Sequence, residues 1–128
     1  MKKLALLVCT LCIIFSSCSN DDESSKQKDE DKLYKMFDEL ITLSEQYTRP
    51  CTNPDEWAYT QINNPCDGQL MLYSKKINTT AFLQKVERYN KLSKAHIKKW
   101  KLICFDDVIP GTIKGIECID EKPKLIIE

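Results

Sequence analysis

Cysteine is the residue type in this sequence with the clearest capacity for chemistry. The chain of 128 residues has seven: Cys9, Cys12, Cys18, Cys51, Cys66, Cys104 and Cys118. The first two lie within an apolar N-terminal segment. Structural zinc sites usually hold cysteines two to four residues apart, and no two of the last four cysteines are that close. These four therefore point to disulfides, and we expect no metal ion.

The N-terminal segment has the features of a lipoprotein signal. Two lysines precede an apolar stretch, residues 4–15, which is too short to cross a membrane as a stable helix. The segment Phe15-Ser16-Ser17-Cys18 resembles a lipobox, because the signal peptidase accepts small residues before the cysteine, although leucine is commoner than Phe15. We expect residues 1–17 to be a signal peptide and Cys18 to carry acyl chains such as palmitate, which attach the protein to a membrane.

The residues after Cys18 are polar, with acidic residues at 21–23. This run resembles the acidic export tag of surface lipoproteins of the Bacteroidota, which implies a location on the outer face of the outer membrane. Residues 19–31 contain no apolar side chain to bury. We therefore expect residues 18–31 to form a lipidated, extended and flexible tether.

An even number of cysteines in a small exported domain predicts two disulfides. Local pairing, Cys51 with Cys66 and Cys104 with Cys118, would close two loops of about 15 residues, each contributing roughly 3 kcal/mol. The other two pairings would tie distant parts of the chain together. The spacing of the cysteines leaves all three pairings open.

No other group of residues suggests catalysis. His96 is the only histidine and lies on the apolar side of a helical pattern, which indicates a structural role. No Gly-x-Ser-x-Gly segment or phosphate-binding glycine loop is present, and we expect the paired acids at 106–107 and at Glu117 and Asp120 to be solvated. The formal net charge of +0 argues against a nucleic-acid partner. The sequence predicts no catalytic residue and no cofactor.

The pattern of apolar residues predicts an α+β fold. The expected elements are a helix over 32–47, strands over 57–62 and 69–74, a long helix over 79–100, a short strand over 102–105, and strands over 113–119 and 124–127. We expect a single domain over residues 32–128. Its two hairpins would form one antiparallel sheet of about four to five strands, with the long helix packed on it and an extra N-terminal helix.

Two groups of side chains are candidates for a binding surface: the aromatic residues Trp57, Tyr59 and Tyr73 of the first hairpin, and the basic residues Lys91, Lys94 and Lys98 of the long helix. Aromatic residues often dominate recognition, although we expect half or more of this set to lie in the core. The basic face could meet anionic headgroups, lipopolysaccharide or an acidic protein. The tether acids could also lie against it.

The chain from about residue 51 to 127 resembles a set of small four-cysteine surface lipoproteins of the Bacteroidota. The residues that carry the likeness are Cys51, Trp57, Cys66, Tyr73-Ser74, Phe82-Leu83, Val86, Tyr89, Cys104, Glu117-Cys118 and Lys122-Pro123-Lys124. The chain departs from relatives at Asp67-Gly68, where they often carry two glycines. The resemblance implies a location and an architecture but no activity.

Together these observations predict a non-enzymatic binding or interaction module, held on the outer membrane surface by its lipid. The sequence identifies neither its ligand nor a protein partner. One alternative is a peptidase inhibitor, whose contact loops we expect at 49–56 and 63–68, since rigid disulfide-braced loops lose little entropy on binding. A second alternative is an envelope-structural protein that binds anionic lipid or lipopolysaccharide through the basic helix. A small hydrolase is the least favoured alternative.

Overall fold

The computed structural model describes residues 20–104 and 111–128 of the chain. The elements, in chain order, are α1 (Asn20–Ser44), the 3₁₀ helix η1 (Pro54–Glu56), β1 (Trp57–Asn64), β2 (Asp67–Ser74), α2 (Thr79–Trp100), β3 (Ile113–Ile119) and β4 (Lys122–Ile127). The α+β class and the two hairpins are confirmed. The expected signal peptide, the acylation at Cys18 and the acids at 106–107 lie outside the described residues.

α2 has the span that the sequence predicts, because its boundaries are set by local signals. Asn78 caps its first turn: the side-chain oxygen accepts a hydrogen bond of 3.1 Å from the backbone N–H of Ala81. Lys101 ends the helix in the left-handed conformation, with φ at 50°. Residues spaced three and four apart form its buried face: Phe82, Val86, Tyr89, Ser93 and His96.

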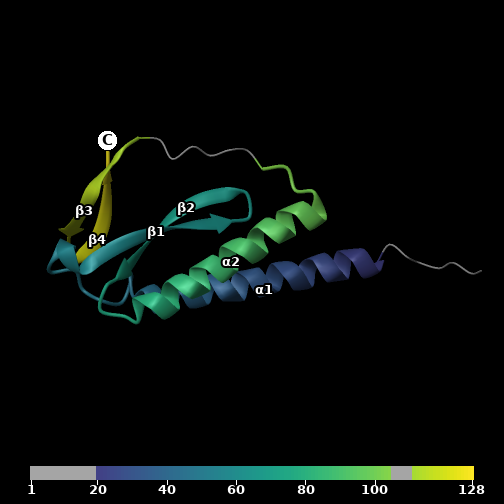
Figure 1. Cartoon of the computed structure of the whole chain (residues 1–128), viewed down its shortest axis with the longest axis horizontal. Helices are drawn as coiled ribbons and strands as arrows, with labels where there is room; N and C mark the ends of the chain where they lie inside the picture. The colour runs from purple at the N-terminus through teal and green to yellow at the C-terminus, as the bar shows by residue number, and fades with distance from the viewer. Residues whose placement is uncertain (1–19, 105–110) are drawn as a thin grey trace, which may run out of the picture.

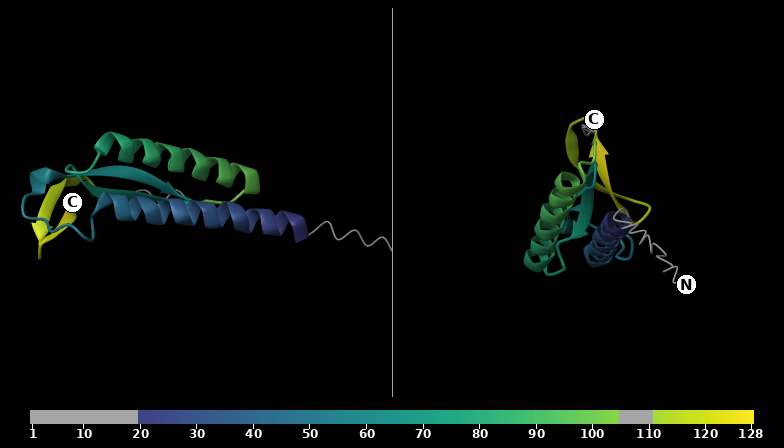
Figure 2. Two further views of the ribbon diagram at one scale, coloured as in Figure 1. Left: turned by 90° about the horizontal axis from the view of Figure 1, so that it is seen from below. Right: turned by 90° about the vertical axis from the view of Figure 1, so that its right-hand side faces the viewer.

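The two helices lie side by side and run in opposite directions, and the β1–β2 hairpin packs against both of them (Figures 1 and 2). This arrangement encloses the hydrophobic core, whose buried members are Leu33, Leu40, Ile62, Met71, Tyr73, Phe82, Val86 and Tyr89. Within the described residues, this core cluster draws on α1, α2 and the first hairpin, and on neither β3 nor β4.

α1 differs from the expected helix at both ends. It begins at Asn20, so residues 20–31 are helical rather than extended. Pairs spaced four apart support this polar stretch, since Lys26 Nζ lies 3.9 Å from Glu30 and Gln27 donates to Asp31 at 2.9 Å. Packing against α2 also stabilises this part of α1. The helix stops at Ser44 rather than at residue 47, because the next residue takes a left-handed φ of 59°.

The strands form two separate two-stranded antiparallel sheets, so the expected single sheet of four to five strands is wrong. The second hairpin meets the first at its end, where β3 packs on η1 and β4 contacts β2 (Figure 1). In that position neither of its strands can hydrogen-bond along β1 or β2. The short strand expected at 102–105 is not formed over 102–104, and residue 105 lies outside the described part of the chain.

The turn of the first hairpin is tighter than expected. The strands pair from Trp57 with Ser74 to Asn64 with Asp67, which leaves two residues, Pro65 and Cys66, in place of a six-residue connection. Cys66 has a φ of 71°, a conformation that non-glycine residues adopt mainly in tight turns. A disulfide holds this turn.

Candidate binding surface

Both expected disulfides form, and each joins distant parts of the chain. Cys51 is bonded to Cys118, 67 residues away, and Cys66 is bonded to Cys104, 38 residues away. The first bond ties the loop after α1 to β3, and the second ties the β1–β2 turn to the segment after α2. Because loop-closure entropy grows with loop length, each stabilises the fold by about 4 kcal/mol.

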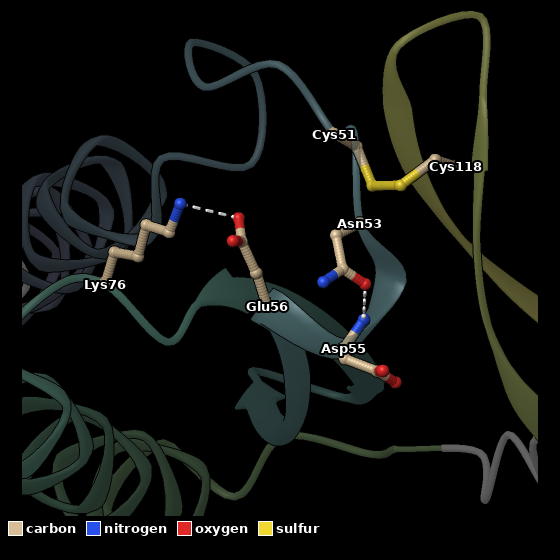
Figure 3. Close-up of a disulfide and its surroundings, with 6 residues drawn as sticks. All are labelled: Cys51, Asn53, Asp55, Glu56, Lys76 and Cys118. Carbon is tan, nitrogen blue, oxygen red and sulfur yellow. Dashed lines mark hydrogen bonds and ion pairs between the residues drawn. A yellow bond between two sulfur atoms is a disulfide. The ribbon is translucent and has the colours of Figure 1, made fainter.

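The loop between α1 and η1 is exposed on both sides of a buried centre. Cys51 is only 2% exposed, whereas Pro50 and Thr52 on either side of it are exposed. The backbone N–H of Cys51 donates to the carbonyl of Glu121 at 2.8 Å, so the centre of the loop is held to the β3–β4 turn. Figure 3 shows the disulfide that joins Cys51 to Cys118 of the second hairpin. The disulfide and this hydrogen bond fix the loop while its side chains face solvent.

The C-terminal half of this loop is shaped by local chemistry. Asn53 caps η1, because its side-chain oxygen accepts a hydrogen bond of 3.0 Å from the backbone N–H of Asp55 (Figure 3). Pro54 occupies the first turn, where a missing N–H costs nothing. The cap therefore fixes the direction in which the chain enters β1.

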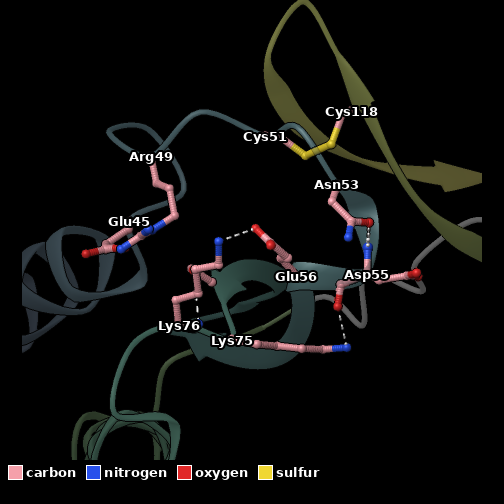
Figure 4. A network of polar contacts seen from close by, with 10 residues as sticks. Glu45, Arg49, Cys51, Asn53, Asp55, Glu56, Lys75, Lys76 and Cys118 are labelled. Atoms are coloured by element: carbon pink, nitrogen blue, oxygen red, sulfur yellow. Dashed lines mark hydrogen bonds and ion pairs between the residues drawn. A yellow bond between two sulfur atoms is a disulfide. The ribbon is translucent and has the colours of Figure 1, made fainter.

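A polar network joins η1 to the turn that follows β2. The backbone N–H of Lys75 donates to the carbonyl of Glu56 at 2.7 Å, and its ammonium donates to the carbonyl of Asp55 at 2.9 Å (Figure 4). Lys76 pairs with the Glu56 carboxylate at 2.8 Å. These contacts hold the loop on the side away from the disulfide.

The N-terminal half of the loop is held by the Arg49–Glu45 pair, drawn in Figure 4. This hydrogen bond raises the pKa of the Arg49 guanidinium above its ordinary value. The carbonyl of Glu45 also accepts the backbone N–H of Arg49 at 2.9 Å. Beside this pair, Tyr47 is 76% exposed.

We call the exposed residues of this region the distal surface. It consists of Tyr47, Thr48, Pro50, Thr52 and Asn53 from the loop, with Asp120 and Glu121 from the β3–β4 turn. It lies at the opposite end of the molecule from the first turn of α1 (Figures 1 and 2). The loop was expected to be a contact site. The β3–β4 turn was not expected to be part of a contact site, because its position beside the loop depends on the pairing of Cys51 with Cys118.

The aromatic group predicted from the sequence does not form one surface. Trp57 is 3% exposed, and the ring of Tyr73 packs 5.0 Å from that of Phe82, so these two residues belong to the interior and not to a binding surface. Tyr59 remains 42% exposed. An aromatic ring gains free energy when its large apolar area is removed from water, so the rings that face the rest of the fold are buried.

Two of the six basic residues of α2 pair with acids of α1. Lys85 pairs with Glu39 of α1 and Lys99 pairs with Asp29 of α1, each at 2.6 Å. Residues 29–31 were expected to be tether acids, and Asp29 does lie against the basic helix. The three lysines predicted as a binding surface, Lys91, Lys94 and Lys98, are all exposed.

His96 is buried between the two helices, as its position on the apolar face predicts, with 5% of its surface exposed. Its Nε2 lies 3.7 Å from Glu30 of α1, and its Nδ1 has no hydrogen-bond partner among the described residues. A neighbouring serine, Ser93, is likewise buried with an unpartnered hydroxyl. Both side chains are enclosed by the helix packing.

Residues 20–104 and 111–128 contain no group of three or more histidine, cysteine or acidic side chains that could hold a metal ion. No helix among them is both long enough and apolar enough to span a bilayer.

Comparisons with known proteins gave no match to a protein-family model, to a curated protein or to a solved structure. The resemblance to small lipoproteins of the Bacteroidota therefore stays an interpretation of the residues alone.

Proposed function

We propose that this protein is a non-enzymatic binding module, held by an acylated Cys18 on the outer face of the outer membrane, and that its distal surface makes the contact. The observation that carries the proposal is the loop around Cys51. It is exposed on both sides, yet the disulfide of the buried Cys51 and a backbone hydrogen bond fix its centre. A loop fixed before binding loses little conformational entropy when a partner is bound.

The direction of α1 supports this arrangement. The helix begins two residues after Cys18 and has 25 residues, so it is about 37 Å long at about 1.5 Å per residue. An acyl group at Cys18 would lie near one end of the molecule, and the distal surface lies at the other (Figure 2). The two disulfides fit an oxidising compartment outside the cytoplasm.

Attachment of the lipid is tested by metabolic labelling with an alkyne fatty acid. We expect label on the wild-type protein and none on a Cys18→Ala variant. Mature protein that carries no fatty acid contradicts the anchor.

The contact surface is tested by site-specific photo-crosslinking on whole cells. A benzoylphenylalanine at Thr52, in the distal loop, is compared with one at Lys35, an exposed position on α1. We expect a discrete adduct from position 52 and none from position 35. Adducts of equal yield at both positions, or none at 52, contradict the distal surface as the site of contact.

Peptidase inhibition is the second candidate, and the same loop favours it, since inhibitors present a rigid exposed segment to the protease. Its test is the activity of purified serine, cysteine and metallo-proteases with and without the protein. Inhibition that is lost in a Tyr47→Ala, Thr52→Ala variant supports it. Unchanged activity in all three classes, or rapid cleavage within residues 47–55, rejects it.

A further inference from the structure

The outer side of α2 carries positive charge that the fold leaves unpaired. Lys85 and Lys99 turn toward α1 and are neutralised by Glu39 and Asp29. Lys91, Lys94 and Lys98 have no acidic partner among the described residues and are exposed. We call these three residues the basic strip.

The basic strip occupies one side of the helix. Its members are spaced three and four residues apart, which places them on one face over about 10 Å of helix. Glu87, one turn before Lys91, is the only acidic residue of α2. Like-charged neighbours at this spacing repel one another slightly, so the cluster of three lysines is not explained by helix stability.

The strip lies in the half of the molecule that contains the start of α1. Asp29 forms an ion pair with Lys99, which lies at the end of α2. Asp29 is nine residues after Asn20, the first residue of α1. The end of the strip is thus about 14 Å along the helix axis from the first residue of α1. Figure 1 shows the same arrangement, with the C-terminal end of α2 beside the N-terminal half of α1.

We infer that the basic strip binds the anionic phosphate headgroups of the membrane that carries the protein. The inference rests on the proposed anchor at Cys18, which would hold the strip within reach of the bilayer. Exposed lysines on a convex helix attract a charged surface without demanding a fixed geometry. Such binding would lay the outer side of α2 on the membrane and leave the distal surface, at the other end, free for a partner.

The negative charge in the first turn of α1 determines which part of the molecule would face an anionic membrane. Asp22 and Glu23 are exposed in the first turn of that helix and would be repelled by anionic headgroups. Attraction would therefore act through α2, and the molecule would tilt onto its basic strip rather than stand on the tip of α1.

The test measures partition of the exported chain 19–128, with both disulfides formed and no acyl group, onto lipid vesicles. This chain contains every helix and strand of the structure. The vesicles are phosphatidylcholine alone, an equal mixture with phosphatidylglycerol, and phosphatidylcholine with lipid A. We expect binding to one or both anionic preparations, weakened by added salt, and none to phosphatidylcholine. Binding to lipid A alone assigns the phosphate to a glycolipid.

The Lys91→Gln, Lys94→Gln, Lys98→Gln variant should lose roughly a hundredfold in partition coefficient. The matched control, Lys35→Gln, Lys122→Gln and Lys124→Gln, removes the same charge from exposed positions elsewhere. It should bind like the wild type, and circular dichroism should show both variants folded. No wild-type binding to either anionic preparation, or equal losses in the two variants, overturns the inference. Fatty-acid labelling reports on the anchor separately, so either idea can fail alone.

Discussion

Cys51 and Cys66 belong to disulfides that differ in access to solvent. Cys51 is 2% exposed and its partner Cys118 is partly exposed, whereas Cys66 and Cys104 are both partly exposed, so only the first bond has one of its two cysteines buried. A thiolate must reach a sulfur atom before it can open the bond. The two disulfides should therefore respond differently to a reductant.

We predict that mild reduction opens Cys66–Cys104 before Cys51–Cys118. Timed alkylation with an isotope-coded reagent, followed by mass spectrometry of the peptides, measures the order. In denaturant, where both bonds are accessible, the rates should become similar. Faster opening of Cys51–Cys118 in the native protein would contradict the burial argument.

Tyr89 is a second residue whose surroundings predict a measurable property. Burial raises the pKa of Tyr89 to about 12, and its hydroxyl donates to Asn64 at 3.0 Å. Because the folded pKa lies above the unfolded value of about 10, this residue stabilises the fold fully below pH 10. That contribution declines as the pH rises toward 12.

We predict that Tyr89→Phe lowers the free energy of unfolding by about 1 kcal/mol at neutral pH, through loss of the hydrogen bond. It should also flatten the decline in stability between pH 10 and pH 12. Urea unfolding at several pH values measures both effects. A variant at the exposed Tyr34 is the control, and an equal change there would contradict the prediction.

At the scale of elements, polar contacts join the start of α1 to the end of α2. Asp29 accepts hydrogen bonds from Lys99 at 2.6 Å and from the indole of Trp100 at 3.2 Å. The bond from Lys99, followed by that from Trp100, lowers the pKa of Asp29 below its ordinary value of 3.8. These contacts fix the polar start of α1 against α2, in addition to the pairs spaced four apart within α1.

The lowered pKa of Asp29 determines how its contribution to stability changes with pH. The contribution of Asp29 is present above the unfolded pKa of about 4 and is lost as the pH falls through the lower, folded value. We predict that Asp29→Asn weakens the contact between the helices at pH 7 and makes little difference in strong acid. Hydrogen exchange of the α1 amides, wild type against variant, measures this. A gap between the two proteins that persists in strong acid would contradict it.

At the scale of the whole molecule, the second hairpin depends on the first disulfide. The core cluster of the described residues contains residues of α1, α2, β1 and β2 only. β3 and β4 are attached at one end, through Cys51–Cys118, the Cys51–Glu121 hydrogen bond and limited packing. A two-stranded hairpin alone is marginally stable in water.

We therefore predict that Cys51→Ser, Cys118→Ser loosens residues 113–127 while α2 and the first hairpin stay folded. Hydrogen exchange with mass spectrometry should show rapid exchange in β3 and β4 and retained protection in α2. The Cys66→Ser, Cys104→Ser variant is the matched control, and its β3 and β4 amides should keep their protection. Uniform loss of protection in the first variant would contradict a separable hairpin.

The sequence by itself determined the features that depend on neighbouring residues. Asn78 and the apolar repeat from Phe82 to His96 specify α2, because caps and helical periodicity act within a few residues. The two hairpins were predicted for the same kind of reason, whereas the presence of two disulfides was predicted from the even number of cysteines in a small exported domain. The buried position of His96 also followed from its place in the repeat.

Only the tertiary structure decided features that depend on which distant segments meet. The pairing of Cys51 with Cys118, the joining of Asp29 to Lys99 and the burial of Trp57 all require contacts between segments far apart in sequence. The spacing of residues along the chain does not indicate which distant segments will be in contact. The distal surface and the unpaired charge of the basic strip follow from them, because packing chooses which loops are fixed together and which charges are neutralised.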